Sequence, residues 1–236
     1  MPDNVYHILS TKELSHDLIE EAATLGIQID CIPFIQVKPI VSDVVRDKVL
    51  PISGEKTTVV FTSVHGVQAI ADLKVDSSQW EIYSLSGATK KAVESSFSNA
   101  IIKAFADNAT ELAQKIVEDK VADVFFFCGN ARREELPNLL HENKVIVHEV
   151  KVYQTHINSV ELQQVYDGIV FFSPSGVESF LLENKMPPTA VLFAIGNTTA
   201  SSLNLFSNEI IIAEKPDPKI LIQKIISRFR ADVVKL

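Results

Sequence analysis

The chain has 236 residues, of which 46% are hydrophobic and 22% are charged, and its formal net charge at pH 7 is −8. This composition is typical of a globular protein and excludes the disordered, collagen-like and disulfide-scaffold classes. The excess of acidic residues disfavours nucleic acid as a partner, because phosphates are repelled. The longest apolar runs fall far short of the roughly 20 residues that a membrane helix needs.

Short apolar runs alternate with helical patterns along the chain. Val5–Leu9 predicts a strand and Thr11–Leu25 an amphipathic helix, which Gly26 ends before a strand that begins at Ile27. Further strands are predicted at Val59–Phe61, Glu81–Leu85, Val124–Phe127, Val145–Val150, Ile169–Phe172, Ala190–Ile195 and Glu209–Ala213. Strands and helices that alternate in this way are typical of βαβ units with parallel sheets.

An internal repeat relates two parts of the chain. VVFTSVHGVQAI at 59–70 aligns with IVFFSPSGVESF at 169–180, and YSLSGATKKAV at 83–93 aligns with FAIGNTTASSL at 193–203, both at an offset of 110 residues. LAQKI at 112–116 aligns with LIQKI at 221–225 at an offset of 109. Two homologous α/β units are the simplest account of blocks that align in this order.

A weaker repeat relates the apolar positions of 27–34 to those of 145–152. The chain therefore consists of a first segment X that contains 27–34, a segment Y that contains the blocks at 59–93, and then a related copy of each in the same order, X′ and Y′. We therefore predict an α/β fold of two parallel-sheet lobes related by internal duplication. The first lobe is discontinuous, residues 1–35 plus 155–236, and the second is inserted, residues 40–150. The extended segments 32–40 and 150–156 are predicted to form a two-stranded β linker between the lobes.

Several predicted strand-to-helix turns are rich in small and hydroxylated residues. They lie at 61–66, 86–89, 127–132, 171–176 and 196–199. Each turn alone is explained by helix capping, but such turns also leave backbone N–H groups open to an anion. Ligands of open parallel sheets bind at the carboxyl ends of strands. If the lobes face each other, the turns form a cleft suited to a ligand with several carboxylates or phosphates.

Four other side chains leave two interpretations open. Arg132 and Arg133 are expected in the first turn of a helix, where they either pair with neighbouring glutamates or meet an anion. Tyr153 either packs in a strand or donates a proton, since a tyrosine is protonated at pH 7. Cys128 ends a buried strand, which favours a core position over a nucleophile.

Other chemistries lack motifs in this sequence. GxGxxG, GxxxxGK[ST], HExxH and GxSxG are absent. The two cysteines, Cys31 and Cys128, form no CxxC pair, so a disulfide or a zinc site is not expected. The N-terminal MPDNVYHILS lacks the pattern of a signal peptide, and we expect a cytoplasmic protein.

The motifs together resemble those of the uroporphyrinogen-III synthases of tetrapyrrole biosynthesis. The matching blocks are FTSVHGVQA (61–69), CGNARREELP (128–137), VYQT (152–155), FFSPSGVESFL (171–181), AIGNTTASSL (194–203) and EKPDPKILIQKI (214–225). They follow the order of the family and span almost the whole chain. The combination of the second, third and fourth blocks is the specific part of the resemblance.

The resemblance implies a lyase of porphyrin and heme biosynthesis. Members remove water from hydroxymethylbilane, a linear tetrapyrrole with eight carboxylates, and cyclise it to uroporphyrinogen III while inverting the last pyrrole ring. The reaction takes place in the cleft between the lobes and uses no metal or organic cofactor. The resemblance also implies a monomer, and we expect at most transient contact with the preceding pathway enzyme.

The resemblance also assigns residues. Tyr153 is expected to be the catalytic acid that donates to the departing oxygen. The expected substrate-binding residues are Ser63, Thr89, Asn130, Ser173, Ser175, Gly196, Asn197, Thr198 and Thr199. The chain departs from the family at Ser86, where a GxxT turn commonly has glycine, and Gly87 is expected to rebuild that turn one residue later.

Two alternatives belong to other functional classes. One is a catalytically inactive tetrapyrrole-binding or regulatory module of the same fold, which loss of Tyr153 or of the paired Ser/Thr turns would have favoured. The other is a two-lobed sugar- or amino-acid-binding protein, which would require an export signal.

Overall fold

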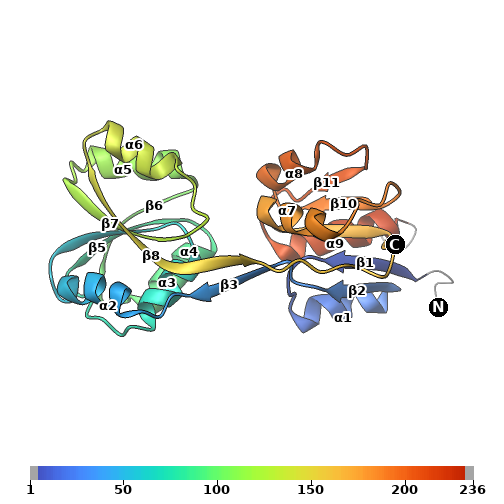
Figure 1. Ribbon diagram of the computed structural model, residues 1–236, viewed down its shortest axis with the longest axis horizontal. Coiled ribbons are helices and arrows are strands. Elements are labelled where there is room, and N and C mark those ends of the chain that lie inside the picture. The colour runs from blue at the N-terminus through green and yellow to red at the C-terminus, as the bar shows by residue number, and fades with distance from the viewer. Residues whose placement is uncertain (1–4, 232–236) are drawn as a thin grey trace. The chain divides into compact units, whose positions relative to one another are not determined.

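A computed structural model describes residues 5–231 (Figure 1). The chain divides into two compact units. Unit 1 combines the described residues up to Gln36 with those from His156 onward, and unit 2 is Val37–Thr155. Residues 1–4 and 232–236, which begin and end the predicted first lobe, lie outside the described residues. Within the described range, no helix has the length and apolar character needed to cross a bilayer.

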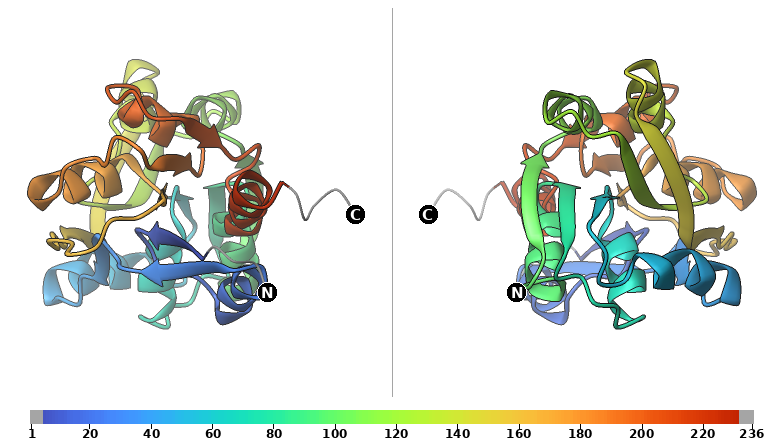
Figure 2. Two further views of the ribbon diagram at one scale, coloured as in Figure 1. Left: turned by 90° about the vertical axis from the view of Figure 1, so that its right-hand side faces the viewer. Right: turned by 90° about the vertical axis from the view of Figure 1, so that its left-hand side faces the viewer.

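Unit 1 contains a parallel sheet with the strand order β11-β10-β9-β1-β2. Its strands are β1 (Tyr6–Ser10), β2 (Ile27–Cys31), β9 (Gly168–Phe171), β10 (Val191–Ala194) and β11 (Ile210–Ile212). Its helices are α1 (His16–Thr24), α7 (Pro174–Glu183), α8 (Asn197–Leu203) and α9 (Pro218–Phe229). The left view of Figure 2 has this unit toward the reader.

The helices of unit 1 cover both faces of its sheet because side chains alternate along each strand. Ile8 and Val170 point to the face covered by α1 and α9, where they share a core with Leu221. Leu9 and Ile169 point to the opposite face and share a core with residues of α7 and α8. Burial on both faces explains why these strands read as continuous apolar runs.

Unit 2 contains a sheet with the order β3-β8-β7-β4-β5-β6, of which β8 to β6 are parallel. Its strands are β3 (Ile35–Pro39), β4 (Thr57–Phe61), β5 (Trp80–Leu85), β6 (Ile101–Ala106), β7 (Asp123–Gly129) and β8 (Ile146–Ile157). Its helices are α2 (Asp43–Val49), α3 (Val64–Ala71), α4 (Ala88–Ser96), α5 (Ala109–Glu118) and α6 (Glu135–Glu142), with a short 3₁₀ turn at Leu50–Ile52. The unit boundaries fall within β3 and β8.

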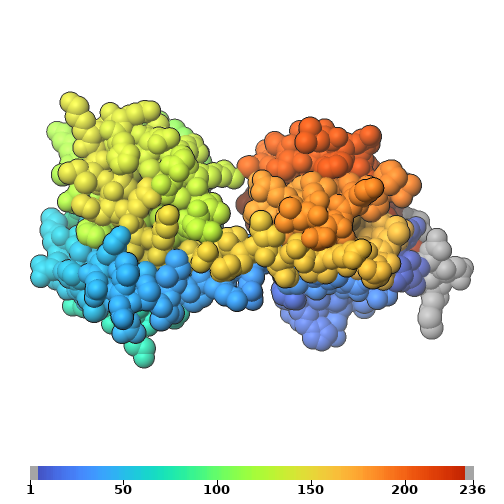
Figure 3. Space-filling view, viewed as in Figure 1, coloured from blue at the N-terminus to red at the C-terminus, as the bar shows by residue number. Residues whose placement is uncertain are grey.

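Two cores hold unit 2 together. Phe61, Trp80 and Phe127 pack with residues of α2, α3 and α4 on one face of the sheet. Val60 and Phe126 pack with residues of α5 and α6 on the other face. Figure 1 shows α5 and α6 on one side of this sheet and α2 and α3 on the other, and Figure 3 shows the close-packed surface that the side chains form in each unit.

Three elements differ from the sequence prediction. The first helix begins at His16 instead of Thr11, because Thr11 is bound to the sheet through its hydroxyl, which donates to the carbonyl of Val170 at 2.8 Å. The last of the predicted strands of unit 2 continues from Val150 to Ile157. Strand β6 was not predicted, because it is an edge strand whose first three residues are exposed and the apolar pattern is weak there.

The aligned repeat blocks form the same elements in the same order. Strands β4 and β9 precede helices α3 and α7, and strands β5 and β10 precede helices α4 and α8. The origin of this correspondence in a duplication stays a prediction, as does the linker role of 32–40 and 150–156.

Candidate active site

The carboxyl ends of the parallel strands of unit 2 form a rim of polar turns. Ser63 follows β4, Ser86 follows β5, and Asn130 follows β7. Tyr153 lies in β8, directly opposite Gly129, after a register shift at the end of β7. The edge at which ligands of such sheets bind therefore carries most of the unit 2 residues that the sequence singled out.

Tyr153 is half-buried and closely surrounded on this rim. A Cβ atom built on Gly129 would lie 2.2 Å from Cε2 of Tyr153, so the ring rests on bare backbone. The ring of His65 lies with its centroid 5.7 Å from that of Tyr153. Burial raises the pKa of Tyr153, and hydrogen bonds with the Ser63 side chain and the Gly129 backbone oppose this only in part. Tyr153 is therefore protonated at neutral pH and can donate a proton.

Ser63 caps helix α3. Its backbone is extended, and its Oγ accepts a hydrogen bond from the N–H of His65 at 3.3 Å. Caps of this kind satisfy one of the N–H groups that have no partner within the helix. The cap and the interaction with Tyr153 place the Ser63 hydroxyl beside the candidate acid.

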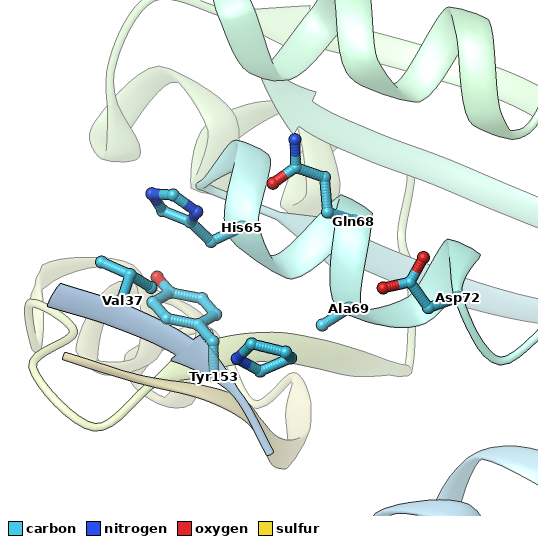
Figure 4. A pocket seen from close by; sticks show the side chains of 7 residues that line it. Val37, His65, Gln68, Ala69, Asp72 and Tyr153 are labelled. Carbon is cyan, nitrogen blue, oxygen red and sulfur yellow. The ribbon is translucent and has the colours of Figure 1, made fainter. Parts of the chain in front are cut away.

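A pocket of about 380 Å³ opens between helix α3 and the strands β3 and β8, entirely within unit 2 (Figure 4). It is lined by Val37, Pro39, His65, Gln68, Ala69, Asp72 and Tyr153. Figure 4 shows the Tyr153 ring across from helix α3, with the His65 side chain near the phenol end of the ring. The hydroxyl of the candidate acid is thus next to a cavity that a ligand can enter.

The turn after β5 is shifted by one residue relative to its repeat partner. Gly87, with φ at +72°, precedes helix α4, whereas Gly196 precedes helix α8 and aligns with Ser86. Only glycine adopts the φ of Gly87 without strain, which is consistent with Gly87 taking over this turn, but that it rebuilds the turn of the family stays a prediction. Thr89 is only 7% exposed, so the exposed part of this turn is the backbone before it.

Asn130 uses its side chain to hold strand β8. Its Oδ1 accepts a hydrogen bond from the backbone N–H of Thr155 at 2.7 Å, and its Nδ2 donates to the Thr155 carbonyl at 3.2 Å. A substrate-binding role of Asn130, which the resemblance implies, therefore falls to its backbone.

The prediction that Arg132 and Arg133 lie in the first turn of a helix is wrong, because α6 begins at Glu135. Arg132 forms a two-point interaction with Glu149 at 2.9 and 2.6 Å and an ion pair with Glu134 at 2.8 Å. These carboxylates raise the pKa of Arg132. The salt-bridge interpretation therefore holds for Arg132, while Arg133 is exposed.

Cys128 is buried in the core with residues of α5 and α6. Burial raises the pKa of its thiol to about 11. The core interpretation of Cys128 is confirmed, because a thiol with this pKa is almost entirely protonated at neutral pH.

Unit 1 has a corresponding rim at the end of β9. Ser173 caps helix α7 by accepting a hydrogen bond from the N–H of Gly176 at 3.0 Å, and its Oγ is 3.1 Å from the Oγ of Ser175. Both hydroxyls are half-buried, and both therefore remain partly accessible at the helix N-terminus.

The turn after β10 places Gly196 before helix α8 in extended backbone, with φ at 179°. Asn197 and Thr198 are exposed, whereas Thr199 is 3% exposed. The accessible groups of this turn are therefore the first two side chains and the backbone N–H groups of the helix.

The sequence interpretation missed Lys12. This residue follows β1, and its Nζ lies 5.9 Å from the ring centroid of Phe172, next to the Ser173 turn. It supplies an exposed cation on the unit 1 rim. The sequence prediction placed Lys12 inside the helix expected at Thr11–Leu25, whereas in the structure it lies in the turn between β1 and α1.

No group of three or more metal-ligating side chains is gathered anywhere in residues 5–231. The polar groups on both rims are mainly hydroxyls and helix N–H groups, which bind anions. The geometry thus offers anion-binding turns in each unit and, in unit 2, a protonated tyrosine beside a pocket.

Comparisons with known proteins agree with this picture. A family model described as "Uroporphyrinogen-III synthase HemD" matches residues 16–223. The uroporphyrinogen-III synthase of Saccharomyces cerevisiae is 28% identical over 174 residues, which are 61% of this chain and 62% of that protein. The chain thus spans less than two thirds of the length of this curated relative.

Solved structures show the same fold at low sequence identity. A mutant uroporphyrinogen III synthase from the extremely thermophilic bacterium Thermus thermophilus superposes with a TM-score of 0.71 at 13% identity, covering 97% of this chain and all of that chain. The uroporphyrinogen-III synthetase of Helicobacter pylori gives 0.69 at 15% identity, covering 95% and 100%. The predicted α/β class with two mainly parallel sheets is confirmed.

Proposed function

The chain belongs to the uroporphyrinogen-III synthase family, and we propose that it is a lyase that converts hydroxymethylbilane to uroporphyrinogen III. The reaction removes water, closes the macrocycle and inverts the last pyrrole ring. The observation that carries the proposal is the placement of Tyr153, a protonated phenol beside a 380 Å³ pocket in a chain of this family.

Tyr153 acts as the acid in the first step. Its proton passes to the hydroxymethyl oxygen of the substrate, the C–O bond breaks, and water leaves. A positioned acid of this kind contributes roughly 10²- to 10⁴-fold to the rate. Burial favours the neutral form of Tyr153, so the proton is available throughout the neutral pH range.

The helix N-termini bind the carboxylates of the substrate. In unit 2 these are the turns at Ser63 and before Thr89, and in unit 1 the turns at Ser173 and Gly196. Backbone N–H groups and the positive end of the helix dipole stabilise a carboxylate there. Such local dipoles explain how a chain with a net charge of −8 binds a polyanion.

Positioning supplies the rest of the catalysis. After water leaves, the last ring attacks through its substituted carbon and forms a spiro intermediate, which competes with simple closure. Holding two reacting groups in one geometry lowers a barrier by as much as about 7–11 kcal/mol. That the rims of both units hold one substrate molecule stays a prediction.

We also propose that the enzyme is a cytoplasmic monomer that needs no metal or organic cofactor and meets the preceding pathway enzyme only transiently. This part rests on the family resemblance. Sedimentation of the purified protein tests whether it is a monomer. Assay after exhaustive treatment with chelator tests whether the reaction needs a metal.

The decisive experiment incubates the purified protein with synthetic hydroxymethylbilane and separates the isomers of the oxidised product. We expect the type III isomer. Only the type I isomer, which forms spontaneously, would contradict the proposal. Tight binding of uroporphyrinogen III without turnover would instead favour the inactive tetrapyrrole-binding module.

A further inference from the structure

A β-bulge in strand β8 determines where the ring of Tyr153 points. Lys151 is the register partner of Cys128, and Tyr153 is the partner of Gly129, so β8 has one residue more than β7 at this point. The extra residue is Val152. A bulge bends its strand and re-aims a side chain, and bulges are common next to active sites.

The bulge brings two consecutive side chains to one face of the sheet. In a regular strand, successive side chains point to opposite faces. Val150 and Val152 are buried in the core that includes residues of α2, α3 and α4, and Tyr153 packs against that same core. Without the extra residue, Tyr153 would point to the face that α5 and α6 cover. The candidate acid therefore lies across from helix α3 because the bulge is present (Figure 4).

The side chain of Asn130 extends the pairing of β7 and β8 directly after the bulge. The last register pair of the two strands is Gly129 with Tyr153, and the chain then enters a turn at Asn130. The Asn130 amide replaces a further strand residue, because it offers an acceptor and a donor as a peptide group does. Its Oδ1 accepts a hydrogen bond from the N–H of Thr155 at 2.7 Å, and its Nδ2 donates to the Thr155 carbonyl at 3.2 Å.

This two-point clamp fixes a strand position and adds nothing to the cores. Asn130 is exposed, so its side chain fills no space in the interior of unit 2. Thr155 is the last residue of the unit. On the other side of the strand, the N–H of Ile40 holds the bulge itself by donating to the carbonyl of Val152 at 2.9 Å. Tyr153 thus lies between a bulge that is held from one side and a clamp that is made from the other.

We propose that Asn130 is a positioning residue for the reaction: its two hydrogen bonds to Thr155 keep strand β8 in the bulged register that directs Tyr153 at the pocket. The inference rests on the proposed function and adds a residue on which the position of the acid depends. The Asn130 side chain acts through Tyr153. When the clamp is lost, the end of β8 can shift, and a displacement of about 1 Å at a reacting group can cost roughly 10²-fold in rate.

The first test compares Asn130→Ala with Asn184→Ala. Asn184 follows helix α7 in unit 1 and forms the same kind of clamp, because its Oδ1 accepts from the N–H of Leu162 at 2.9 Å and its Nδ2 donates to the carbonyl of Val160 at 2.7 Å. We expect Asn130→Ala to lower kcat for hydroxymethylbilane at least tenfold and to change KM less than threefold. Asn184→Ala should lower the melting temperature at least as much and keep kcat. A kcat of Asn130→Ala within twofold of the parent, or a loss confined to KM, would overturn the proposal.

The second test asks whether Asn130 acts through Tyr153. Asn130→Ala is introduced into the Tyr153→Phe variant, which has no phenol to position. We expect the added substitution to lower the remaining turnover less than twofold, because the effects of residues that act as a unit are not additive. If Asn130→Ala costs the same factor in both backgrounds, the side chain acts independently of Tyr153 and the proposal is wrong.

A third measurement does not require activity. Tyrosine labelled with ¹³C in the ring reports on Tyr153 by NMR, and the Tyr153→Phe variant assigns its signal. We expect Asn130→Ala to move this signal toward that of an exposed tyrosine, whereas Asn184→Ala should leave it in place. An unmoved Tyr153 signal in Asn130→Ala would show that the clamp does not position the ring. Type I product from the unmodified protein would instead overturn the proposed function, so the two failures are distinguishable.

Discussion

The Cα atom of Gly129 faces the ring of Tyr153 so closely that no side chain fits between them. The two residues are register partners on β7 and β8, and a Cβ atom on Gly129 would approach Cε2 of Tyr153 to 2.2 Å. Real Cβ contacts essentially never fall below 3.0 Å. The position of the candidate acid therefore depends on the absence of a side chain on the neighbouring strand.

Gly129→Ala is expected to displace the Tyr153 ring and to lower turnover at least tenfold. Overpacking of this kind also lowers the free energy of unfolding by about 1–3 kcal/mol. Turnover of hydroxymethylbilane and urea unfolding of the same preparation measure the two effects.

A second glycine and a double variant serve as controls for this substitution. Nothing lies within 4 Å of a Cβ built on Gly196, and its φ of 179° is extended backbone that any residue adopts, so Gly196→Ala should leave the stability nearly unchanged. Combining Gly129→Ala with Tyr153→Ala should recover part of the lost stability, because the contact is then gone. Equal stability losses in the two glycine variants would refute the contact as the cause.

Tyr153→Phe removes the proton of the candidate acid and keeps the ring. We expect turnover to fall by roughly 10²-fold or more, with little change in stability. Tyr83 offers the reverse case, because its buried hydroxyl donates to Asp119 on the far face of the sheet. Tyr83→Phe should lower stability by about 1 kcal/mol and keep turnover. Full activity of Tyr153→Phe would remove this residue from the acid role.

Much of the fold was predictable because its signals are local. Apolar runs identified most of the strands, and Ser63 and Ser173 stood at predicted helix starts and do cap helices α3 and α7. The capping hydroxyl and the N–H that it satisfies are two or three residues apart in the chain. The capping hydroxyl and its N–H partner therefore belong to one short motif, which the sequence alone reveals.

The rest depended on contacts between distant parts of the chain. The backbone around Asn130 was expected to bind substrate, which stays a prediction, but the bonds of the Asn130 side chain to Thr155, 25 residues away, were not foreseen. Thr89 was expected to bind substrate, and the packing that leaves it only 7% exposed was not foreseen from the sequence. The pocket itself brings together β3, α3 and β8, and no local pattern indicates that these three elements meet there.

Arg132 is expected to act in stability and not in binding. Its side chain is 16% exposed and pairs with Glu149, which is 26% exposed. Arg132→Ala should lower the free energy of unfolding by about 1–3 kcal/mol, because Glu149 keeps a partly buried charge without its partner. Glu134→Gln should cost far less, since that carboxylate is 68% exposed. Equal costs in chemical denaturation would contradict this account.

Alkaline pH is expected to destabilise the fold through groups whose neutral form the structure favours. Burial raises the pKa of Tyr166 to about 12 and that of Cys128 to about 11, and it also raises the pKa of Tyr153. A group with a raised pKa contributes its full stability below its ordinary pKa and loses it as the pH rises through the folded value. The free energy of unfolding should therefore fall from about pH 9 toward pH 12. Tyr166→Phe should make this fall shallower, and an unchanged slope would contradict the assignment.

Lys12 is expected to strengthen substrate binding without taking part in the chemistry. Its ammonium group lies beside Phe172 at the start of the Ser173 turn, where the proposed function places substrate carboxylates. An exposed ion pair contributes about 0.2–1 kcal/mol, so Lys12→Ala should raise KM up to about fivefold and leave kcat unchanged. The KM of the variant should also depend less on ionic strength, because salt screens exposed charges. Lys185→Ala removes the same charge just beyond the opposite end of helix α7 and should change neither parameter. A fall in kcat with constant KM would show that Lys12 contributes to the reaction step instead.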